Sequence, residues 1–414
     1  MSSWQIAMLH YAAPPIVGGV ESTIYHHARL LSGKGYVIDV IAGRGGQFYP
    51  GVAYHPVPLV DSRHPEIQAI GHQLAEGQEP DGFYQLRDQI IEALKPVLSR
   101  SGVCIVHNAI SLHKNLPLTA ALRCLADERI TKFIAWCHDF AWQDELYAAD
   151  LHDGYPWDLL RSAWPGVRYV VVSEHRRERL ATLLEIPTAD VLVINPGVDV
   201  ARFLKLEPLT QKIVERFDLL SADPLLLLPA RITRRKNIQF AIRVTSALSR
   251  HKPNVALVIT GPPGPHNPKN VAYLDSLKEL SAQLGVADRV HFLYEAGDGS
   301  EPLHIPDAVV ADLYHLSDAL LFPSRREGFG IPVLEAGLAR IPVFAADIPP
   351  VRESAGEHAF LFDPRGDPDS VGREILSQLN IDRAYLLRHR VLDQYTWEAI
   401  IEQRLIPLLE ENTA

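Results

Sequence analysis

The chain is poor in the residues that build disulfide frameworks and thiolate metal sites. Its 414 residues include three cysteines, Cys104, Cys124 and Cys137, whose spacing matches no metal-binding pattern. An odd number of cysteines also argues against a disulfide framework, so we expect small apolar side chains in or near strands. No stretch approaches the roughly 20 apolar residues of a membrane-spanning helix, and the first residues lack the basic start of a signal peptide. We therefore expect a cytoplasmic protein.

Positive charge is also scarce. The chain carries 40 basic and 50 acidic residues, and its net charge is −10. The first 199 residues contain 16 basic and 22 acidic ones, so neither half is a basic domain. This balance argues against nucleic acid as a partner. The densest basic cluster, at 175–179, has acidic neighbours, which weakens the case for association with an anionic membrane.

Short apolar segments alternate with helical patterns along most of the chain. Segments such as 103–106 and 132–137 each end in polar residues, as in a parallel sheet with one functional edge. A second series of the same kind begins at 225–228, and the length favours two domains. The stretch 49–82 is rich in glycine, proline and polar residues, so we expect irregular structure there, with an edge strand near 52–57. The sequence thus predicts an α/β protein with two doubly wound sheets in series.

One stretch, 323–337, has the pattern of a ligand site. It follows the apolar segment 318–322, contains a glycine-bearing turn and continues as a helical pattern. Open α/β sheets bind ligands at the carboxyl ends of their strands, and the N–H groups at a helix start favour an anion. Glu327 and Glu335 can accept hydrogen bonds from sugar hydroxyls. Together these parts predict a site for a sugar nucleotide.

The first strand is followed by a similar but weaker signal. The segment 5–9 is apolar, Gly18 and Gly19 follow it, and a helix is expected over 21–32. A glycine pair is often only a tight turn. Its position in the first strand-to-helix loop of a doubly wound sheet makes it a candidate ligand contact.

The motifs together resemble a known family. Glu327 and Glu335, separated by seven residues around Gly-Phe-Gly, resemble the E-x7-E motif of retaining glycosyltransferases of family 4, which have the GT-B fold. The resemblance spans almost the whole chain, although 143–164 and 295–306 match nothing in it. Further motifs occur in the family's order, namely Gly18-Gly19, His138-Asp139, Asn195-Pro-Gly-Val-Asp199, Arg231 with Lys236, Thr260-Gly261, Pro323-Ser324 and Tyr395-Thr396-Trp397.

The resemblance implies an architecture of two Rossmann-like domains facing a cleft. The first, over 1–200, would bind the acceptor, and the second, over 201–394, would bind the nucleotide sugar. Residues 395–414 would form a helix that crosses back to the first domain. An amphipathic helix containing Leu405 and Leu408 needs such an apolar surface.

The resemblance also implies roles for individual residues. Arg231 and Lys236 resemble the basic pair that holds the donor diphosphate, where fixed cations stabilise the charge of the leaving group. Glu335 resembles the ribose-binding glutamate, Glu327 the glutamate facing the transferred hexose, and His138 the strand-terminal histidine near the donor sugar. The predicted catalytic residues are His138, Arg231, Lys236 and Glu327, and the predicted donor-binding residues are Gly18, Gly19, Gly261, Leu293, Tyr294, Gly328, Phe329, Gly330, Ile331 and Glu335.

The implied reaction is transfer of a hexose, with retention, from a UDP- or GDP-linked donor to an acceptor hydroxyl. The leaving phosphate oxygen would take the acceptor's proton, because no carboxylate is obviously placed as a nucleophile. We expect no metal and no other cofactor. Asp367-Pro-Asp369 has the D-x-D pattern of metal-dependent glycosyltransferases, yet it precedes a helix, so we expect an N-cap.

Three alternatives remain open from the sequence. A sugar phosphorylase or sugar-nucleotide epimerase would share both domains and the phosphate site. A nicotinamide-dependent enzyme would need a G-x-G-x-x-G fingerprint, which Gly18-Gly19 does not supply. A non-catalytic sugar-binding protein would not need two cations and two glutamates together. The donor base, the acceptor (a sugar, a lipid-linked sugar or a small molecule) and the oligomeric state also stay open.

Overall fold

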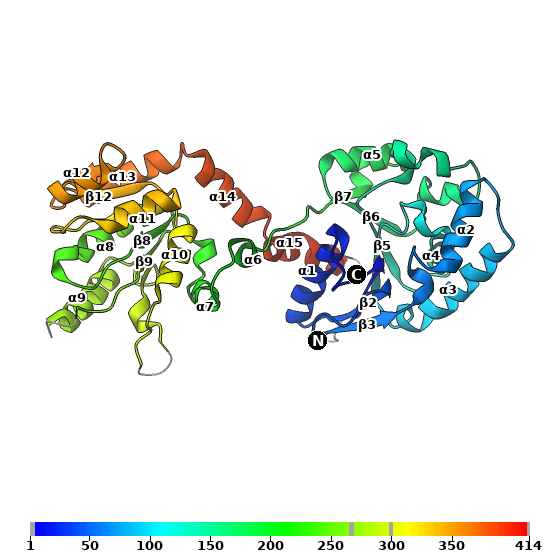
Figure 1. The fold of residues 1–414 in the computed structure, drawn as a ribbon, viewed down its shortest axis with the longest axis horizontal. Helices are drawn as coiled ribbons and strands as arrows, with labels where there is room; N and C mark the ends of the chain where they lie inside the picture. Colours follow the sequence, from blue (N-terminus) through cyan, green and yellow to red (C-terminus); the bar gives the residue numbers. More distant parts are fainter. Residues whose placement is uncertain (1–4, 265–268, 298–300, 412–414) are drawn as a thin grey trace. The chain divides into compact units, whose positions relative to one another are not determined.

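A computed structural model of the chain describes residues 5–264, 269–297 and 301–411. Its residues divide into two compact units (Figure 1), Met1–Val198 with Tyr395–Ala414, and Asp199–Gln394, called unit 1 and unit 2 below. Each unit is built on one parallel sheet with helices between the strands, so the predicted α/β class with two doubly wound sheets is confirmed. Among the helices of the described residues, none combines the length and apolar character that a membrane crossing requires.

Unit 1 contains a seven-stranded sheet with the order β3-β2-β1-β4-β5-β6-β7. The order changes direction between β1 and β4, where doubly wound sheets bind ligands. Its strands are β1 (Gln5–Ala12), β2 (Val37–Arg44), β3 (Val52–Pro56), β4 (Val103–His107), β5 (Lys132–Cys137), β6 (Val167–Val171) and β7 (Val191–Val193). Its helices before the crossing are α1 (Gly19–Gly33), α2 (Pro65–Ala75), α3 (Gly82–Leu98), α4 (Leu116–Asp127) and α5 (Glu174–Leu184), with short 3-10 turns η1 (Pro58–Val60), η2 (His113–Asn115), η3 (Ala141–Gln143), η4 (Glu145–Asp150), η5 (Trp157–Leu160) and η6 (Thr188–Asp190).

Unit 2 contains a six-stranded sheet with the order β10-β9-β8-β11-β12-β13, which changes direction between β8 and β11. Its strands are β8 (Leu225–Leu228), β9 (Ala256–Ile259), β10 (Val290–Phe292), β11 (Ala319–Phe322), β12 (Val343–Ala346) and β13 (Phe360–Phe362). Its helices are α6 (Val200–Leu204), α7 (Pro208–Phe217), α8 (Ile238–Ser249), α9 (Lys269–Gln283), α10 (Asp307–Leu316), α11 (Ile331–Ala339), α12 (Pro349–Ala355), α13 (Pro368–Leu379) and α14 (Arg383–Gln394), with the turns η7 (Leu219–Ser221), η8 (Arg234–Lys236) and η9 (Leu293–Glu295).

Both faces of the unit 1 sheet are buried, which explains why its strands are almost continuously apolar. In β1, Ala7 and Leu9 belong to one core and Ile6 and Met8 to another, because successive side chains point to opposite faces. The expectation of irregular structure over 49–82 was wrong for α2. That helix begins with Pro65 and buries Ile67, Ile70 and Leu74, which lie on one helical face.

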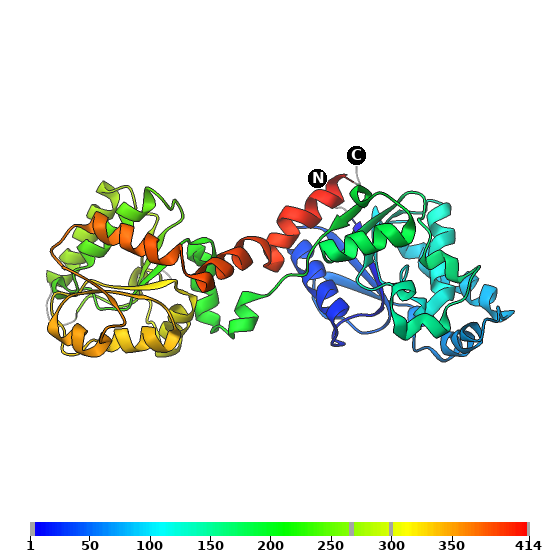
Figure 2. The same cartoon turned by 90° about the horizontal axis from the view of Figure 1, so that it is seen from above.

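The last helical segments complete one of these cores (Figure 2). They are α15 (Trp397–Ile400), a π-helical turn η10 (Ile401–Leu405) and α16 (Ile406–Glu411). Ile400, Ile401 and Leu405 are buried in the same core as Ile6 and Met8. The prediction that the C-terminal helix returns to the first domain is therefore confirmed.

The chain passes between the units twice, after Val198 and before Tyr395, and these two connecting segments are hydrogen-bonded to each other. The backbone N–H of Val198 donates to the carbonyl of Tyr395 at 2.7 Å, and the N–H of Trp397 donates to Val198 at 3.2 Å. A Cβ at Gly197 would lie 2.8 Å from the Cα of Trp397, so only glycine allows this approach. The ring of His26 stacks on Trp397 with centroids 4.8 Å apart.

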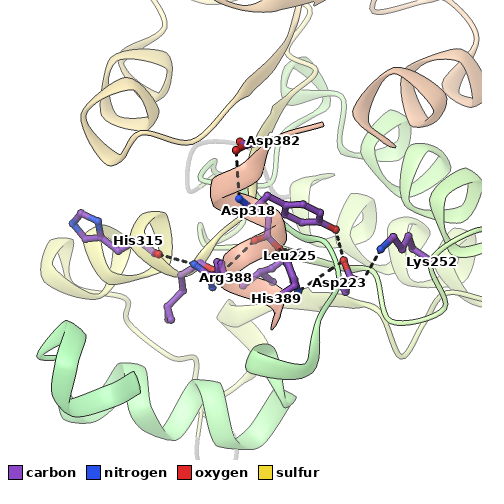
Figure 3. A network of polar contacts seen from close by, with 10 residues as sticks. Asp223, Leu225, Lys252, His315, Asp318, Asp382, Arg388 and His389 are labelled. Carbon is purple, nitrogen blue, oxygen red and sulfur yellow. Dashed lines mark hydrogen bonds and ion pairs between the residues drawn. The ribbon is translucent and has the colours of Figure 1, made fainter. Parts of the chain in front are cut away.

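A polar network at the amino edge of the unit 2 sheet holds α14 (Figure 3). Asp318, just before β11, accepts hydrogen bonds from the backbone N–H of Leu225 at 2.7 Å and from His389 at 3.1 Å. Arg388 lies 3.4 Å from the other Asp318 oxygen and also donates to the carbonyl of His315. We call Asp223, Lys252, Asp318, Tyr385, Arg388 and His389 the amino-edge network.

Candidate active site

The stretch 323–337 forms a turn and a helix at the carboxyl end of β11. Phe322 ends the strand, Gly330 caps α11, and Pro332 occupies its first turn. Gly330 has φ +100°, in the left-handed region that favours glycine, which explains the residue type at this cap. Pro332 has no N–H, and the N–H of Val333 donates to the carbonyl of Gly330 at 2.9 Å, so the N–H of Ile331 is the group at this helix start that can face an anion.

Lys236 and Glu327 form an ion pair beside this turn. Nζ of Lys236 lies 2.5 Å from Oε1 of Glu327, and the two side chains are 10% and 9% exposed. Arg235 donates to the other carboxylate oxygen at 3.2 Å but is half exposed. The backbone N–H of Arg325 donates to the carbonyl of Arg235 at 2.8 Å, so the loop after β8 and the loop after β11 are joined. The loops thus bring a buried cation and a buried carboxylate into contact.

Arg231 and Gly261 lie where the loops after β8 and β9 meet. Arg231 is exposed, and the described residues show it in no ion pair with Glu327. A Cβ at Gly261 would lie 2.5 Å from the carbonyl oxygen of Ala230 and 2.7 Å from the Cα of Arg231. The N–H of Ile232 donates to Pro262 at 2.9 Å. Glycine at 261 is therefore required for the close approach that positions Arg231.

Glu335 lies on α11 and receives a hydrogen bond from a neighbouring helix. Oη of Tyr314, on α10, donates to Oε2 of Glu335 at 2.6 Å and lies 3.3 Å from the carbonyl oxygen of Pro332. Burial and the adjacent carboxylate both raise the pKa of Tyr314, so its hydroxyl remains a donor. Glu335 itself is exposed, with its carboxylate held by this one buried tyrosine.

The other predicted donor-binding residues of unit 2 differ in accessibility. Gly328 has open space around it, and Phe329 and Ile331 are 42% and 61% exposed. Leu293 is fully buried. The neighbouring Tyr294 accepts, at its carbonyl oxygen, a hydrogen bond from the N–H of Leu303 at 3.0 Å. This contact joins η9 to the segment 295–306, of which 298–300 lie outside the described residues.

In unit 1, the glycine pair begins α1. Gly18 is the N-cap of this helix in an extended conformation, and Gly19 is its first residue. Gly18 has no side chain to cap α1, and the carboxylate of Glu21 in the first turn lies close to it, since a Cβ at Gly18 would be 2.1 Å from Oε2 of Glu21. Thr23 donates its hydroxyl to the carbonyl of Gly19 at 3.0 Å. The glycine pair thus places the start of α1 at the ligand-binding edge of the sheet, with the carboxylate of Glu21 beside it.

His138 follows β5 and is held by the loop after β4. Oδ1 of Asn108 accepts hydrogen bonds from the backbone N–H groups of His138 at 2.7 Å and of Asp139 at 3.3 Å. Asn108 has φ +57°, a conformation that asparagine tolerates better than most residues. The ring nitrogens of His107 (Nδ1) and His138 (Nε2) are 3.4 Å apart. Burial first, and then His10, lower the pKa of His138 to about 4, so the imidazole is neutral at pH 7.

The buried His10, His27 and His107 and the partly buried His138 form a histidine cluster at this edge. His27, on α1, is fully buried, and burial followed by the charges of His138 and His26 lowers its pKa to about 3. Its ring meets that of Trp136 edge-on, with centroids 4.9 Å apart. Across the described residues, no group of three or more His, Cys, Asp or Glu side chains is arranged to hold a metal ion. Asp367 accepts from the N–H groups of Asp369 and Ser370, which confirms the predicted N-cap.

Two family models match the chain. The model described as "Glycosyl transferases group 1" matches residues 211–391, and the model described as "Glycosyltransferase Family 4" matches residues 17–202. The chain belongs to the glycosyltransferases of family 4. The predicted family and GT-B fold class are thereby confirmed, as is the prediction of an enzyme at the level of the family.

Several relatives of this family 4 glycosyltransferase are named enzymes. D-inositol 3-phosphate glycosyltransferase of Actinosynnema mirum is 34% identical over 187 residues, which cover 44% of this chain and 41% of the relative. Mannosylglucosylglycerate synthase of Petrotoga mobilis is 25% identical over 269 residues, 60% of each chain. The match therefore spans only about half the length of these first relatives. Among solved structures, a glycosyltransferase from Rickettsia africae aligns over 100% of this chain and 99% of its own, with 19% identity and a TM-score of 0.39.

Some residues around the family 4 site could not be assigned from the sequence. Ser324 was part of a family motif but had no role, and its buried hydroxyl has no hydrogen-bond partner among the described residues. Arg235 was not among the predicted site residues, whereas it contacts Glu327. No sequence pattern around Tyr314 or Asn108 indicates a role in the site. Only the fold brings them to Glu335 and His138.

Proposed function

We propose that the chain transfers a hexose, with retention, from a UDP- or GDP-linked donor to an acceptor hydroxyl. The observation that carries the proposal is the Lys236–Glu327 pair beside the open start of α11. Lys236 and Arg231 would hold the donor diphosphate, and the N–H of Ile331 at the start of α11 would share its charge. Glu327 would accept hydrogen bonds from the hexose hydroxyls, and Glu335 from the ribose.

These residues would act by positioning the donor and acceptor and by stabilising the charge of the leaving diphosphate. As the anomeric C–O bond to phosphate breaks, negative charge grows on the leaving diphosphate, where fixed cations are most effective. The acceptor oxygen bonds to the anomeric carbon, and its proton passes to the leaving phosphate oxygen. The neutral imidazole of His138 can donate or accept one hydrogen bond to a sugar hydroxyl without adding charge.

The identity of the donor can be tested with a panel of UDP- and GDP-sugars. A nucleotide sugar that binds the folded protein should raise its melting temperature. Transfer assays with the stabilising donor, with the anomeric configuration of the product read by NMR, test retention. The proposal would be contradicted if no nucleotide sugar stabilised the protein, or if the product had the inverted anomeric configuration. Consumption of a sugar phosphate, or release of an epimerised nucleotide sugar without transfer, would favour the phosphorylase or epimerase alternative.

A further inference from the structure

A pocket of about 570 Å³ lies at the open edge of the unit 2 sheet, beside β13. β13 is the last strand in the order of that sheet. The walls come mainly from this strand, the loop that follows it and the first half of α13, and none of the predicted donor-binding residues contributes to them. We call this site the β13 pocket, and the lining residues that matter here are Phe360, Leu361, Phe362, Asp363, Asp367 and Glu374.

The backbone of β13 offers hydrogen-bonding groups at this edge. Leu361 lies opposite Ala345 in the parallel pair of β12 and β13. The N–H of Asp347 donates to the carbonyl of Phe362 at 2.7 Å, so Phe362 directs its backbone groups toward β12. Because these groups alternate in direction along a strand, the N–H and C=O of Leu361 point to the open edge. Among the described residues no strand pairs with β13 on that side, so both groups are available to an added strand.

The side chains of β13 form an apolar surface that is partly accessible. Leu361 is 37% exposed, and Phe360 and Phe362 are partly buried. The ring of Phe360 stacks on that of Phe344 with centroids 5.0 Å apart, and the ring of Phe362 stacks on that of Phe240 at 5.3 Å. Because each ring is held by a neighbour, an apolar side chain of a partner would meet a fixed surface.

The charge of the β13 pocket has one sign. Asp363, Asp367 and Glu374 are exposed, and none of the described residues that line the pocket is Lys, Arg or His. Asp367 lies 3.7 Å from Arg373, whereas Asp363 and Glu374 have no cation within ion-pair distance in the part of the chain that the structure describes. By contrast, an arginine and a lysine line the pocket beside β10, the other edge strand of this sheet. Charge complementarity at β13 therefore favours a cationic partner.

We infer that the β13 pocket binds an extended basic segment of another protein, which adds to the unit 2 sheet as a further strand. The backbone of that segment would exchange hydrogen bonds with Leu361, and its Lys or Arg side chains would meet Asp363 and Glu374. A small cation would use the carboxylates but not the outward N–H of β13, because an ammonium group only donates. A second copy pairing through its own β13 would bring like charges together, which opposes self-association. Three residues of strand span about 10 Å, so the contact would involve roughly three to five residues of the partner.

Binding is measured by calorimetry on the full chain. The probe is an end-blocked hexapeptide of alternating lysine and valine, compared with a peptide that has glutamate in place of lysine. The basic peptide should bind at least about tenfold more tightly, and its affinity should fall as salt is added. The double variant Asp363→Asn, Glu374→Gln keeps an acceptor oxygen at both positions and should weaken this binding about tenfold. The charge-matched control Asp275→Asn, Glu279→Gln, at exposed positions on α9, should leave it unchanged.

Strand addition is then tested with N-methylated forms of the basic peptide, one methylated at its valines and the other at its lysines. Only alternate residues of an added strand face the sheet edge, so one form should lose about tenfold in affinity and the other should bind like the parent. Equal affinities of the parent and both methylated forms, or equal behaviour of the two double variants, would overturn the inference. Spermine binding as tightly as the peptide would identify a small-cation site instead. Sedimentation showing self-association that Asp363→Asn, Glu374→Gln changes would identify a second copy as the occupant, and would equally overturn it.

Discussion

The ammonium of Lys236 and the carboxylate of Glu327 meet at 2.5 Å, although 91 residues separate them in the chain. Both side chains are about nine-tenths buried, and a buried charge that loses its partner is costly. A donor whose diphosphate draws Lys236 away must therefore offer Glu327 new hydrogen bonds, such as those of hexose hydroxyls. The pair would thus couple recognition of the phosphate to recognition of the sugar.

Lys236→Ala should lower kcat by about 10²–10³-fold, because the cation acts most strongly as charge develops on the leaving group. Steady-state kinetics with varied donor would measure it. Arg234→Ala is the matched control, since Arg234 is exposed and lies over the ring of Tyr273 at 5.0 Å, away from Glu327. Equal, small effects of the two substitutions on kcat would show that the diphosphate is held elsewhere.

Tyr314→Phe should raise the donor KM several-fold with little change in kcat. The substitution removes the hydrogen bond that holds Glu335, and a ribose contact is similar in the ground and transition states. Tyr273→Phe, which removes another buried hydroxyl of unit 2, should leave the donor KM unchanged. A fall in kcat at constant KM would instead place Glu335 close to the reacting carbon.

Unit 1 should lose stability on mild acidification because of its histidine cluster. The pKa of His27 is about 3 in the folded chain against 6.5 for a free histidine, so the unfolded state binds more protons below pH 6.5. Stability is retained above that pH and falls as the pH decreases toward 3, by about 1.4 kcal/mol per pH unit for this group. Denaturant unfolding of unit 1, measured at several values between roughly pH 7.5 and pH 5, would record the loss.

His27→Leu should reduce this acid sensitivity, since it removes the titrating group while keeping an apolar contact with Trp136 and Trp397. His175→Leu, at an exposed position on α5, should leave the slope unchanged. An identical pH dependence in the wild type and in His27→Leu would mean that His27 is not the group that takes up the proton.

Asp318→Ala should destabilise unit 2 by about 3–5 kcal/mol, because Arg388 and His389 would lose a fully buried carboxylate (Figure 3). Donor binding should survive in the fraction that remains folded, since the amino-edge network lies at the opposite edge from α11. Asp369→Ala breaks an exposed pair with Arg250 and should cost less than about 1 kcal/mol. Chemical denaturation of the three proteins compares these values. If Asp318→Ala lowered the free energy of unfolding by less than about 1 kcal/mol, the buried carboxylate of Asp318 would not be important for the stability of unit 2.

Local sequence patterns were enough to predict the strand, turn and helix around Gly330. An apolar run, a glycine where the backbone needs a positive φ and a helical pattern all lie within about 20 residues, so no distant contact is required. The return of the C-terminal helix was likewise predictable from its apolar face. α2 was missed because its short apolar stripe lies among glycines, prolines and polar residues, which dominate a composition-based reading.

Contacts between distant segments could not be predicted. Glu327 and Lys236 were assigned separate partners, and only the folded loops show that they pair with each other. The same holds for Tyr314 with Glu335, which belong to different helices, and for the gathering of His10, His27 and His107 around His138. Such pairings depend on the order of strands in the sheet, which no single segment encodes.

The return of the chain to unit 1 has a consequence for the order of events during synthesis. Unit 2 is continuous from Asp199 to Gln394, so all its residues have left the ribosome before those that complete unit 1. The nascent first 198 residues lack Ile400, Ile401 and Leu405, so the core on one face of their sheet, which α1 covers in part, stays incomplete. All of unit 2 can therefore be made before the core that contains Ile400, Ile401 and Leu405 is complete.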